Sequence, residues 1–381
     1  MKKDILISHV HMQTGGIETS LVNLLNSLDK NKYNIDLLLF YPTGKLIDLI
    51  PDWVNIVPIW NTNKRNHRLL KNIILSRNII CRIIKNIICN PMTAKLFIPK
   101  KKYDVAIAYS GYSNFIDTVS GKSNATNKFI WVHADFLTQY NIDESFRKKF
   151  KQIYKKYKYF DKIVVVSKSA ADNFKKLCPE LSNKVTFQWN INKERVVESS
   201  TDANINFDKN CYNIVAIARL AKYKGIERLV ETANLLKQNG SLNFRIYVLG
   251  DGPSRKSIQE RIDELKLNDN FILLGNIDNV FPIIKQADLY VSPSDSEGFS
   301  SVTLEALISN LPVVATPTAS SKDIFEFVAP KGSMLLTEDI SENGICNAIL
   351  KASKELNKNF KFDIEELNLK ILKDFEEKIN N

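Results

Sequence analysis

A strand–turn–helix–strand unit between Asp288 and Pro317 constrains the fold of this chain more than any other stretch. An apolar strand over 289–291 leads into a polar turn, and a helix is expected to begin near Ser300. A second apolar strand over 312–315 follows the helix. This order of elements is the building block of a parallel sheet with helical connections.

Two glutamates in this unit are separated by seven residues, with Glu297 on the turn and Glu305 about one and a half turns into the helix. The free N–H groups of the helix start lie between them and favour phosphate by dipole and hydrogen bonding together. One crevice would thus offer a carboxylate for a sugar hydroxyl, amides for a diphosphate and a carboxylate for a ribose. An isolated pair of glutamates is more often an ordinary turn residue and an ordinary surface residue. Whether this pair forms a binding site therefore depends on the neighbouring motifs.

The chain has 381 residues, which is enough for two domains. No run approaches the roughly 20 apolar residues of a spanning helix, and the N-terminus lacks the features of a signal peptide. The five cysteines form no CxxC pair. They are expected to be reduced thiols of a cytoplasmic protein, and a zinc site is not expected.

The charge is distributed unevenly along the chain. Residues 1–190 hold 30 Lys and Arg against 14 Asp and Glu, whereas the remainder holds 23 against 28. The basic surplus therefore belongs to the first half alone. A nucleic acid, an anionic membrane surface or a polyphosphate substrate would each explain it.

Apolar strands alternate with turns or helical patterns in the first half, which indicates an open, mostly parallel α/β sheet. The first strand, over 5–7, leads through Gly15-Gly16 into a helix over 17–28. A Gly-Gly pair between a strand and a helix lets backbone amides approach a ligand. Further strands are expected at 35–41, 54–60, 105–109, 129–133 and 163–167.

Three histidines follow predicted strands of the first half. His133 lies at the carboxyl end of its strand, the position beyond which ligands bind in such sheets. A lone histidine is more often structural, but the strand end and the nearby Asp135 make a site role for His133 an equal alternative. His9 and His11 end the first strand and are weaker candidates.

Two segments combine an apolar stripe at helical spacing with many cations. They are residues 68–89 and residues 145–160, and the second contains seven Lys and Arg. Such patterns suit a helix on an anionic membrane surface. The alternative is a helix whose stripe faces the core and whose basic face is solvated. The cations of the second segment that are expected to reach lipid are Lys148, Lys149, Lys151, Lys155 and Lys156.

The pattern changes over residues 190–210, a polar stretch in which we place the domain boundary. Beyond it, a strand over 214–218 ends at Arg219, and Lys224-Gly225 precedes a helix. Arg219 offers a fork for phosphate oxygens and Lys224 a point charge, so the turn is a candidate anion cradle.

Two more strands of the second half, over 245–249 and 271–274, end at Gly250-Asp251-Gly252-Pro253 and at Gly275. Four strand ends are therefore expected to converge on the carboxyl edge of a second doubly wound sheet.

The motifs Gly15-Gly16, Arg219…Lys224-Gly225, Gly250-Asp251-Gly252-Pro253 and Glu297-Gly298-Phe299…Glu305 together resemble the retaining glycosyltransferases of family 4, which have the GT-B fold. The resemblance covers nearly the whole chain. It implies two Rossmann-like, doubly wound α/β domains that face each other across a cleft. The acceptor-binding domain would be residues 1–195, the nucleotide-sugar-binding domain 196–355, and a helical segment, 356–381, would return towards the first domain.

The resemblance also implies residue roles. Arg219 and Lys224 would hold the diphosphate, assisted by backbone amides, and Glu305 would bind the ribose hydroxyls. Glu297 would bind hydroxyls of the donor sugar, and His133 would stand near that sugar. The implied catalytic residues are Glu297, His133, Arg219 and Lys224. The implied donor-binding residues are Gly15, Gly16, Arg219, Lys224, Gly250, Glu297, Phe299, Ser300, Ser301 and Glu305.

The chain departs from the family pattern at three places. Ala218 replaces the usual Gly before Arg219, and Ser300 stands where a Gly is frequent. The usual Gly-rich continuation after Thr316 is replaced by residues 317–321, which leaves the shape of that loop and the choice of acceptor open.

The implied reaction is the transfer of a hexose from a nucleoside-diphosphate sugar, with UDP favoured, to a hydroxyl of a glycan. The acceptor is expected to be a lipid-linked intermediate of bacterial surface-polysaccharide synthesis. No Asp-x-Asp occurs, so no metal and no other cofactor is expected. The resemblance favours retention by a same-face route. The protein is expected to be cytoplasmic, attached peripherally to the inner face of the cell membrane, and not bound to nucleic acid.

Two rival interpretations stay open at this point. One is a sugar-nucleotide epimerase of the same fold, which product analysis would distinguish. The other is a non-enzymatic basic protein that binds a membrane or a nucleic acid. The helical stripe of aromatics at 145–160 and the lack of a recognisable binding module disfavour nucleic acid.

Overall fold

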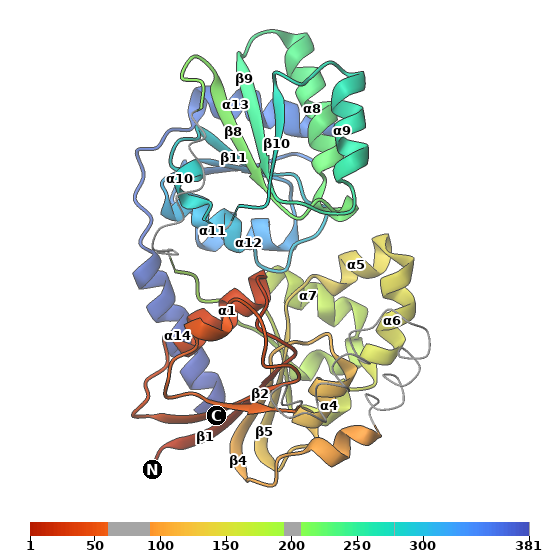
Figure 1. Ribbon diagram of the computed structural model, residues 1–381, viewed down its shortest axis with the longest axis vertical. Helices are drawn as coiled ribbons and strands as arrows, with labels where there is room; N and C mark the ends of the chain where they lie inside the picture. The colour runs from red at the N-terminus through yellow and green to blue at the C-terminus, as the bar shows by residue number, and fades with distance from the viewer. Residues whose placement is uncertain (60–91, 194–206, 278, 381) are drawn as a thin grey trace. The chain divides into compact units, whose positions relative to one another are not determined.

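The computed structural model describes residues 1–59, 92–193, 207–277 and 279–380. The chain divides into two compact units, the first comprising Met1–Ile191 with Leu369–Asn381 and the second Asn192–Asn368 (Figure 1). The sequence-based division was made at residues 195 and 355. The predicted amphipathic segment 68–89, most of the polar stretch 190–210 and the last residue of the predicted strand 54–60 lie outside the described residues.

The first unit is built on a parallel sheet of seven strands in the order β3-β2-β1-β4-β5-β6-β7. Its strands are β1 (Lys3–His9), β2 (Tyr33–Leu39), β3 (Asn55–Pro58), β4 (Tyr103–Ala108), β5 (Ala125–Val132), β6 (Lys162–Val165) and β7 (Val185–Phe187). The α-helices described in this unit are α1 (Gly16–Leu25), α4 (Asn114–Gly121), α5 (Phe136–Ile142), α6 (Glu144–Tyr154), α7 (Lys168–Leu177) and most of α14 (Ile364–Asn380).

Helix α14 is fixed to the first sheet by contacts along its length. The rings of Phe375 and Trp131 lie 5.9 Å apart between centroids. Gln188 donates a hydrogen bond to the carbonyl oxygen of Ile371, at 2.9 Å, and Lys3 Nζ donates to a carbonyl near the end of the helix. The end of the described chain therefore belongs to the unit in which the chain begins.

The second unit is built on a parallel sheet of six strands in the order β10-β9-β8-β11-β12-β13. Its strands are β8 (Tyr212–Ile217), β9 (Phe244–Leu249), β10 (Phe271–Gly275), β11 (Leu289–Ser292), β12 (Val313–Ala315) and β13 (Met334–Leu336). The α-helices described here are α8 (Ile226–Asn239), α9 (Arg255–Glu264), α10 (Phe281–Ile284), α11 (Ser301–Ile308), α12 (Ala319–Phe327) and α13 (Glu342–Glu355).

Each sheet has helices on its faces (Figure 1), which is why its strands are near-continuous apolar runs with no polar face. Strand order reverses beside β1 in the first sheet and beside β8 in the second. Ligands of open α/β sheets bind beyond the carboxyl ends of the strands at such a point. The predicted fold class, two Rossmann-like parallel-sheet domains, is confirmed. The short strands β7 and β13 were not predicted from the sequence.

The aromatic stripe of the basic segment 145–160 faces the interior of the first unit. Helix α6 ends at Tyr154 and a short 3₁₀ turn, Tyr157–Tyr159, follows. The stripe residues that are buried are Phe146, Phe150, Ile153, Tyr157 and Phe160. The core-facing alternative for this segment is therefore confirmed, and its aromatic rings are not available to lipid.

Lys156, predicted to reach lipid, is instead buried. Its side chain is 3% exposed, and Nζ donates to Asp117 Oδ2 at 2.5 Å and to the carbonyl oxygen of Gly111 at 2.8 Å. The prediction was wrong for this residue because its amino group pairs with the buried carboxyl group of Asp117 on α4 and therefore does not reach the surface. Within the described residues, no helix has both the length and the apolar composition needed to cross a membrane.

Candidate functional site

The carboxyl end of β8 leads into a turn that carries both predicted phosphate-binding cations. Gly250, at the end of β9, adopts a φ of +129°, and a Cβ there would collide with the carbonyl oxygen of Ala218. The amide of Leu220 donates to the carbonyl oxygen of Asp251 at 3.0 Å. These contacts fix the backbone on both sides of Arg219. The Arg219 side chain is exposed and makes no hydrogen bond or ion pair within the described part of the chain.

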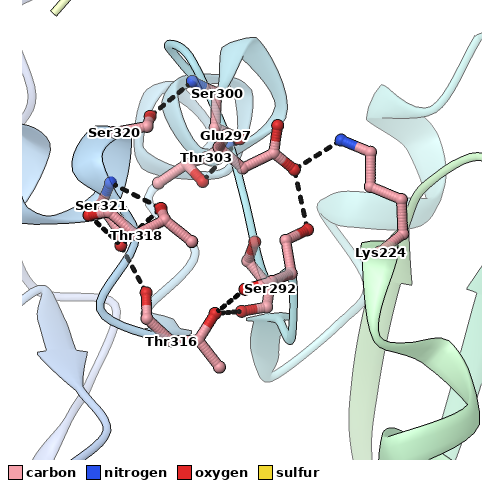
Figure 2. Close-up of polar contacts among 10 residues, drawn as sticks. Lys224, Ser292, Glu297, Ser300, Thr303, Thr316, Thr318, Ser320 and Ser321 are labelled. Carbon is pink, nitrogen blue, oxygen red and sulfur yellow. Dashed lines mark hydrogen bonds and ion pairs between the residues drawn. The ribbon is translucent and has the colours of Figure 1, made fainter. Parts of the chain in front are cut away.

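Lys224 and Glu297, predicted separately as site residues, are brought into contact (Figure 2). Lys224 Nζ donates to Glu297 Oε1 at 2.6 Å, and the hydroxyl of Ser294 donates to the same oxygen at 2.7 Å. The two charged side chains are 18% and 17% exposed. The pair is therefore shielded enough to be well oriented, and it remains within reach of a ligand.

A second ion pair joins the turn that carries Lys224 to the turn that carries Glu297. Arg228, in the first turn of α8, pairs with Asp295 and donates through Nη1 to the carbonyl oxygen of Pro293 at 3.2 Å. The amide of Asp295 donates to the carbonyl oxygen of Tyr223 at 2.9 Å. The two strand-end turns are thus linked by three polar contacts.

Gly225 is required at this junction for two reasons. It adopts a φ of +69°, in the left-handed region that favours glycine, and a Cβ there would collide with the carbonyl oxygen of Pro293. Sequence reasoning did not find the Arg228–Asp295 pair, because the partners are separated by 67 residues and neither belongs to a recognised motif.

The start of α11 is capped by the serine that replaces the family's frequent glycine. Ser300 Oγ accepts from the amide of Thr303 at 3.3 Å, and the amide of Ser300 donates to Ser320 Oγ at 2.6 Å (Figure 2). Ser300 therefore has an internal acceptor for its amide. The amides of Ser301 and Val302 have no intrahelical acceptor, as the first turn of a helix requires, and they are the groups suited to bind an anion.

Residues 316–321, which include the replacement for the Gly-rich continuation, form a network of hydroxyl contacts. Thr316 Oγ1 donates to the carbonyl oxygens of Ser294, at 2.5 Å, and Ser292, at 3.2 Å (Figure 2). Thr318 caps α12 by accepting from the amide of Ser321 at 3.2 Å. The Thr316 hydroxyl thus holds the backbone that leads from β11 towards Glu297, whereas Thr318 holds the start of α12.

The buried phenol of Tyr290, in β11, is influenced by the charge of both glutamates of the Glu-x7-Glu motif. Burial in β11 raises the pKa of its phenol well above the usual value, and the carboxylates of Glu297 and Glu305 raise it further. Both carboxylates therefore act on one buried phenol. Glu305 is half-buried on α11, and Phe299 is buried in the turn before it. Tyr290 was not singled out in the sequence, because it lies within an apolar strand.

The remaining predicted residues, Gly15, Gly16 and His133, belong to the first unit. Gly15 is the N-cap of α1, and Gly16 is exposed with open space at its Cβ position. His133 Nε2 lies 2.9 Å from the carbonyl oxygen of Tyr109, which can only accept, so Nε2 carries the proton. Burial, together with the nearby charge of His9, lowers the pKa of His133 to about 3. The imidazole is therefore neutral at physiological pH.

Residues 197–355, which make up most of the second unit, match the family model described as Glycosyl transferases group 1. The chain is 28% identical over 200 residues to the uncharacterized glycosyltransferase MJ1059 of Methanocaldococcus jannaschii, covering 51% of this chain and 49% of that protein. It is 26% identical over 186 residues to the O-antigen biosynthesis glycosyltransferase WclY of Escherichia coli, covering 48% and 49%. The chain thus spans about half the length of these curated relatives.

The whole fold is shared with a solved glycan-binding structure. A mutant of TarM from S. aureus, in complex with fondaparinux, alpha-GlcNAc-glycerol and UDP, superposes with a TM-score of 0.70. The match covers 100% of both chains at 15% sequence identity. At this identity the likeness establishes the fold, and the chemistry has to be argued from the residues of this chain.

Proposed function

We propose that this protein transfers a hexose from a nucleoside-diphosphate sugar, with UDP as the favoured nucleotide, to a hydroxyl of a glycan. The observation that carries the proposal is the 2.6 Å contact between Lys224 and Glu297 at the carboxyl edge of the second sheet. It places a phosphate-binding cation beside a carboxylate suited to sugar hydroxyls. The similarity of residues 197–355 to Glycosyl transferases group 1 supports this interpretation, as does the UDP in the TarM structure.

The chemical difficulty of the reaction is charge separation, because a positively charged sugar develops while the diphosphate leaves. Arg219, Lys224 and the amides of Ser301 and Val302 would stabilise the leaving diphosphate where its charge grows. When the donor binds, Lys224 would release the carboxylate of Glu297 and bind phosphate oxygens instead. Glu297 would then be free to accept from hydroxyls of the sugar, and Glu305 would bind the ribose.

We further propose a retaining, metal-independent, same-face reaction in which the leaving phosphate takes the acceptor proton. The low pKa of His133, about 3, supports this route, because a base that weak does not remove a hydroxyl proton at neutral pH. His133 would act as a hydrogen-bonding group. Activity in excess EDTA and a product with the anomeric configuration of the donor, measured by NMR coupling constants, are expected. Inversion, or a strict need for a divalent ion, would contradict this part of the proposal.

We propose that the acceptor is a lipid-linked glycan and that the protein binds anionic membrane peripherally. The basic surplus of residues 1–190 and the similarity to an O-antigen glycosyltransferase support this setting. Because the aromatic stripe of residues 145–160 is buried, the attraction would be electrostatic, through the exposed cations Lys148, Lys149, Lys151 and Lys155. Co-sedimentation with anionic vesicles at low salt, lost near 0.5 M salt, is expected. Failure to sediment at low salt would remove the membrane proposal alone.

The direct test of the transfer proposal is a thermal-shift screen of the full chain against UDP, GDP and their sugars. Binding to the native state raises apparent stability by mass action, by about 2.7 kcal/mol at a ligand concentration of 100 times Kd. We expect a shift with UDP and, in a separate assay, release of UDP from a UDP-sugar when a glycan acceptor is added. The absence of a shift with every nucleotide would overturn the proposal.

A further inference from the structure

One short turn of the first unit exposes large apolar side chains that the fold does not bury. The 3₁₀ turn η2 (Thr93–Phe97) follows Met92, and the side chains of Met92 and Leu96 are 83% and 81% exposed. Apart from Met1, they are the most exposed large apolar side chains in the described part of the chain. Because burial of such side chains is favourable, two of them at one turn indicate a surface that a partner covers.

The opposite side of this turn is fixed to the core of the first unit. Ala94 is fully buried, and the ring of Phe97 lies 5.5 Å from the ring of Phe115 on α4, between centroids. Both residues of the turn pack in one apolar cluster with α4. The core therefore already uses two apolar residues of η2, whereas Met92 and Leu96 face solvent.

The charge around the two exposed side chains is of one sign. Residues 92–102 contain four lysines and no Asp or Glu. Three of these lysines, Lys95, Lys100 and Lys102, are exposed, and the first directly precedes Leu96. An apolar pair among exposed cations matches a partner that is anionic at its surface and apolar beneath. A bilayer that contains anionic lipid has this composition.

The turn η2 and the basic helix α6 are both anchored to α4. Phe115 of α4 packs against Phe97, and Asp117 of α4 pairs with Lys156, just beyond the end of α6. The exposed cations of α6 and the exposed apolar side chains of η2 are therefore attached to a common element of the first unit.

We propose that Met92 and Leu96 insert into the interface of an anionic lipid bilayer and so determine which face of the first unit meets the membrane. The inference rests on the membrane binding proposed above and names the side chains that reach the lipid chains. Cations attract the protein from a distance, whereas apolar side chains contribute only on contact. The cations would therefore supply the attraction, and the apolar pair would set the depth and orientation of the bound protein.

The apolar pair does not replace the electrostatic attraction. Even a single myristoyl chain, which is much larger than these two side chains, holds a protein on a membrane only marginally. Loss of binding near 0.5 M salt is therefore expected with the pair in place, because the attraction between the lysines and the lipid is then screened.

Tryptophan substitutions in the full chain test the inserted position. L96W is compared with L369W, because Leu369 is also a highly exposed leucine of the first unit, at 67%, but lies one turn after Glu365 and Glu366 on α14. The vesicles contain phosphatidylglycerol with brominated acyl chains, which quench indole fluorescence in contact with them. At low salt, we expect the emission added by L96W to shift to the blue and to be quenched, and the emission added by L369W to stay unchanged.

Vesicle sedimentation measures the contribution of the pair to affinity. M92S/L96S should lower the affinity for phosphatidylglycerol vesicles roughly tenfold at low salt, because two apolar side chains no longer leave water. Its salt dependence should match that of the wild type, since no charge is removed. K148Q/K149Q, which removes two exposed cations of α6, should weaken the salt dependence instead. The thermal unfolding midpoint of M92S/L96S should stay unchanged, because both side chains are exposed.

L96W emission that is not quenched on vesicles that sediment the protein overturns the proposal and leaves the membrane binding intact. Unchanged vesicle affinity of folded M92S/L96S also overturns it, and if that variant does not fold, the L96W result decides. Wild-type dimers that M92S/L96S fails to form, measured by analytical ultracentrifugation, would assign the turn to a second copy of the chain and contradict lipid insertion. If the wild type does not sediment with anionic vesicles at low salt, the proposed membrane binding and this inference both fall.

Discussion

At the carboxyl edge of the second sheet, charged groups of both signs are within reach of a ligand: Arg219 is exposed, and Lys224 and Glu297 are 18% and 17% exposed. At the same edge of the first sheet, Glu18 in the first turn of α1 is 12% exposed and lies beside His11, whereas the Nδ1 atoms of His9 and His133 are buried. Two copies of one architecture therefore carry different charged groups at the same edge. The parallel sheet determines where a ligand binds, and a few strand-end residues determine which ligand it is.

The two edges also differ in how their turns are braced. In the first unit, Lys156 is buried and holds Asp117 and the carbonyl oxygen of Gly111, in the turn after β4. In the second unit, Arg228 and Asp295 are each about one-fifth exposed and link the turns that carry Lys224 and Glu297. A buried pair is costly to break, because the remaining charge has no partner, whereas a half-buried pair is partly compensated by water. The first brace should matter most for folding and the second for activity.

The largest expected effect is on the stability of the first unit. K156A should lower the free energy of unfolding by about 3–5 kcal/mol, because it leaves the buried carboxylate of Asp117 unpaired. The control is K155A, at an exposed neighbouring position, which should change it by less than about 0.5 kcal/mol. Chemical denaturation of both variants measures the difference. A loss of under 1 kcal/mol for K156A would contradict the claim that the buried pair stabilises the fold.

The next largest effect is on turnover. R219A, K224A and E297A should each lower kcat by about 100-fold, the scale of removing one preorganised charge partner in a site. K222A serves as the control, since this exposed lysine lies in the same turn. Circular dichroism should remain native for all four variants. Full activity of E297A would break the assignment of the second edge as the reacting side.

Loss of the second brace should have a smaller effect on the same reaction. R228A should lower kcat/KM roughly tenfold, because the two turns lose a charge-assisted link and the Lys224–Glu297 geometry loosens. R228K should restore part of the loss, and R228A with D295A should cost little more than R228A alone, because the two residues act together. Fully additive losses would show that Arg228 does not act through Asp295. The exposed pair of Arg261 and Glu231 on the same unit provides the control, and R261A should stay near wild type.

The smallest effect is expected at the ribose position. E305A should weaken UDP binding roughly fivefold, the value of about one net hydrogen bond, and should change kcat little at saturating donor. Isothermal titration with UDP measures the first quantity and steady-state kinetics the second. An unchanged Kd would rule out the ribose role of Glu305.

Sequence patterns were sufficient where the chemistry depends on short-range spacing. The strand ends that carry Arg219, Lys224 and Glu297 could be found because apolar strands and glycine turns are local signals, and β8 pairs with β11 in the structure. The burial of Lys156 against Asp117 could not be predicted in this way. An amphipathic stripe does not specify whether its polar flank meets water or a buried carboxylate, and Asp117 lies 39 residues away in the sequence.

The contacts of Glu18 were also beyond sequence reasoning. Glu18 was not singled out, because a glutamate in the first turn of a helix is common for reasons of the helix dipole alone. Its contacts with His9 and His11 are visible only in the structure.

The central claim is that the diphosphate binds at the carboxyl edge of the second sheet, through Arg219 and Lys224. Isothermal titration of UDP into the full chain tests it with two variants, R219A/K224A and K222A. We expect the double variant to lose UDP affinity by at least 100-fold, as removal of two charge-assisted contacts predicts, and K222A, at an exposed lysine of the same turn, to bind UDP like the wild type. UDP binding that survives in R219A/K224A would contradict the account.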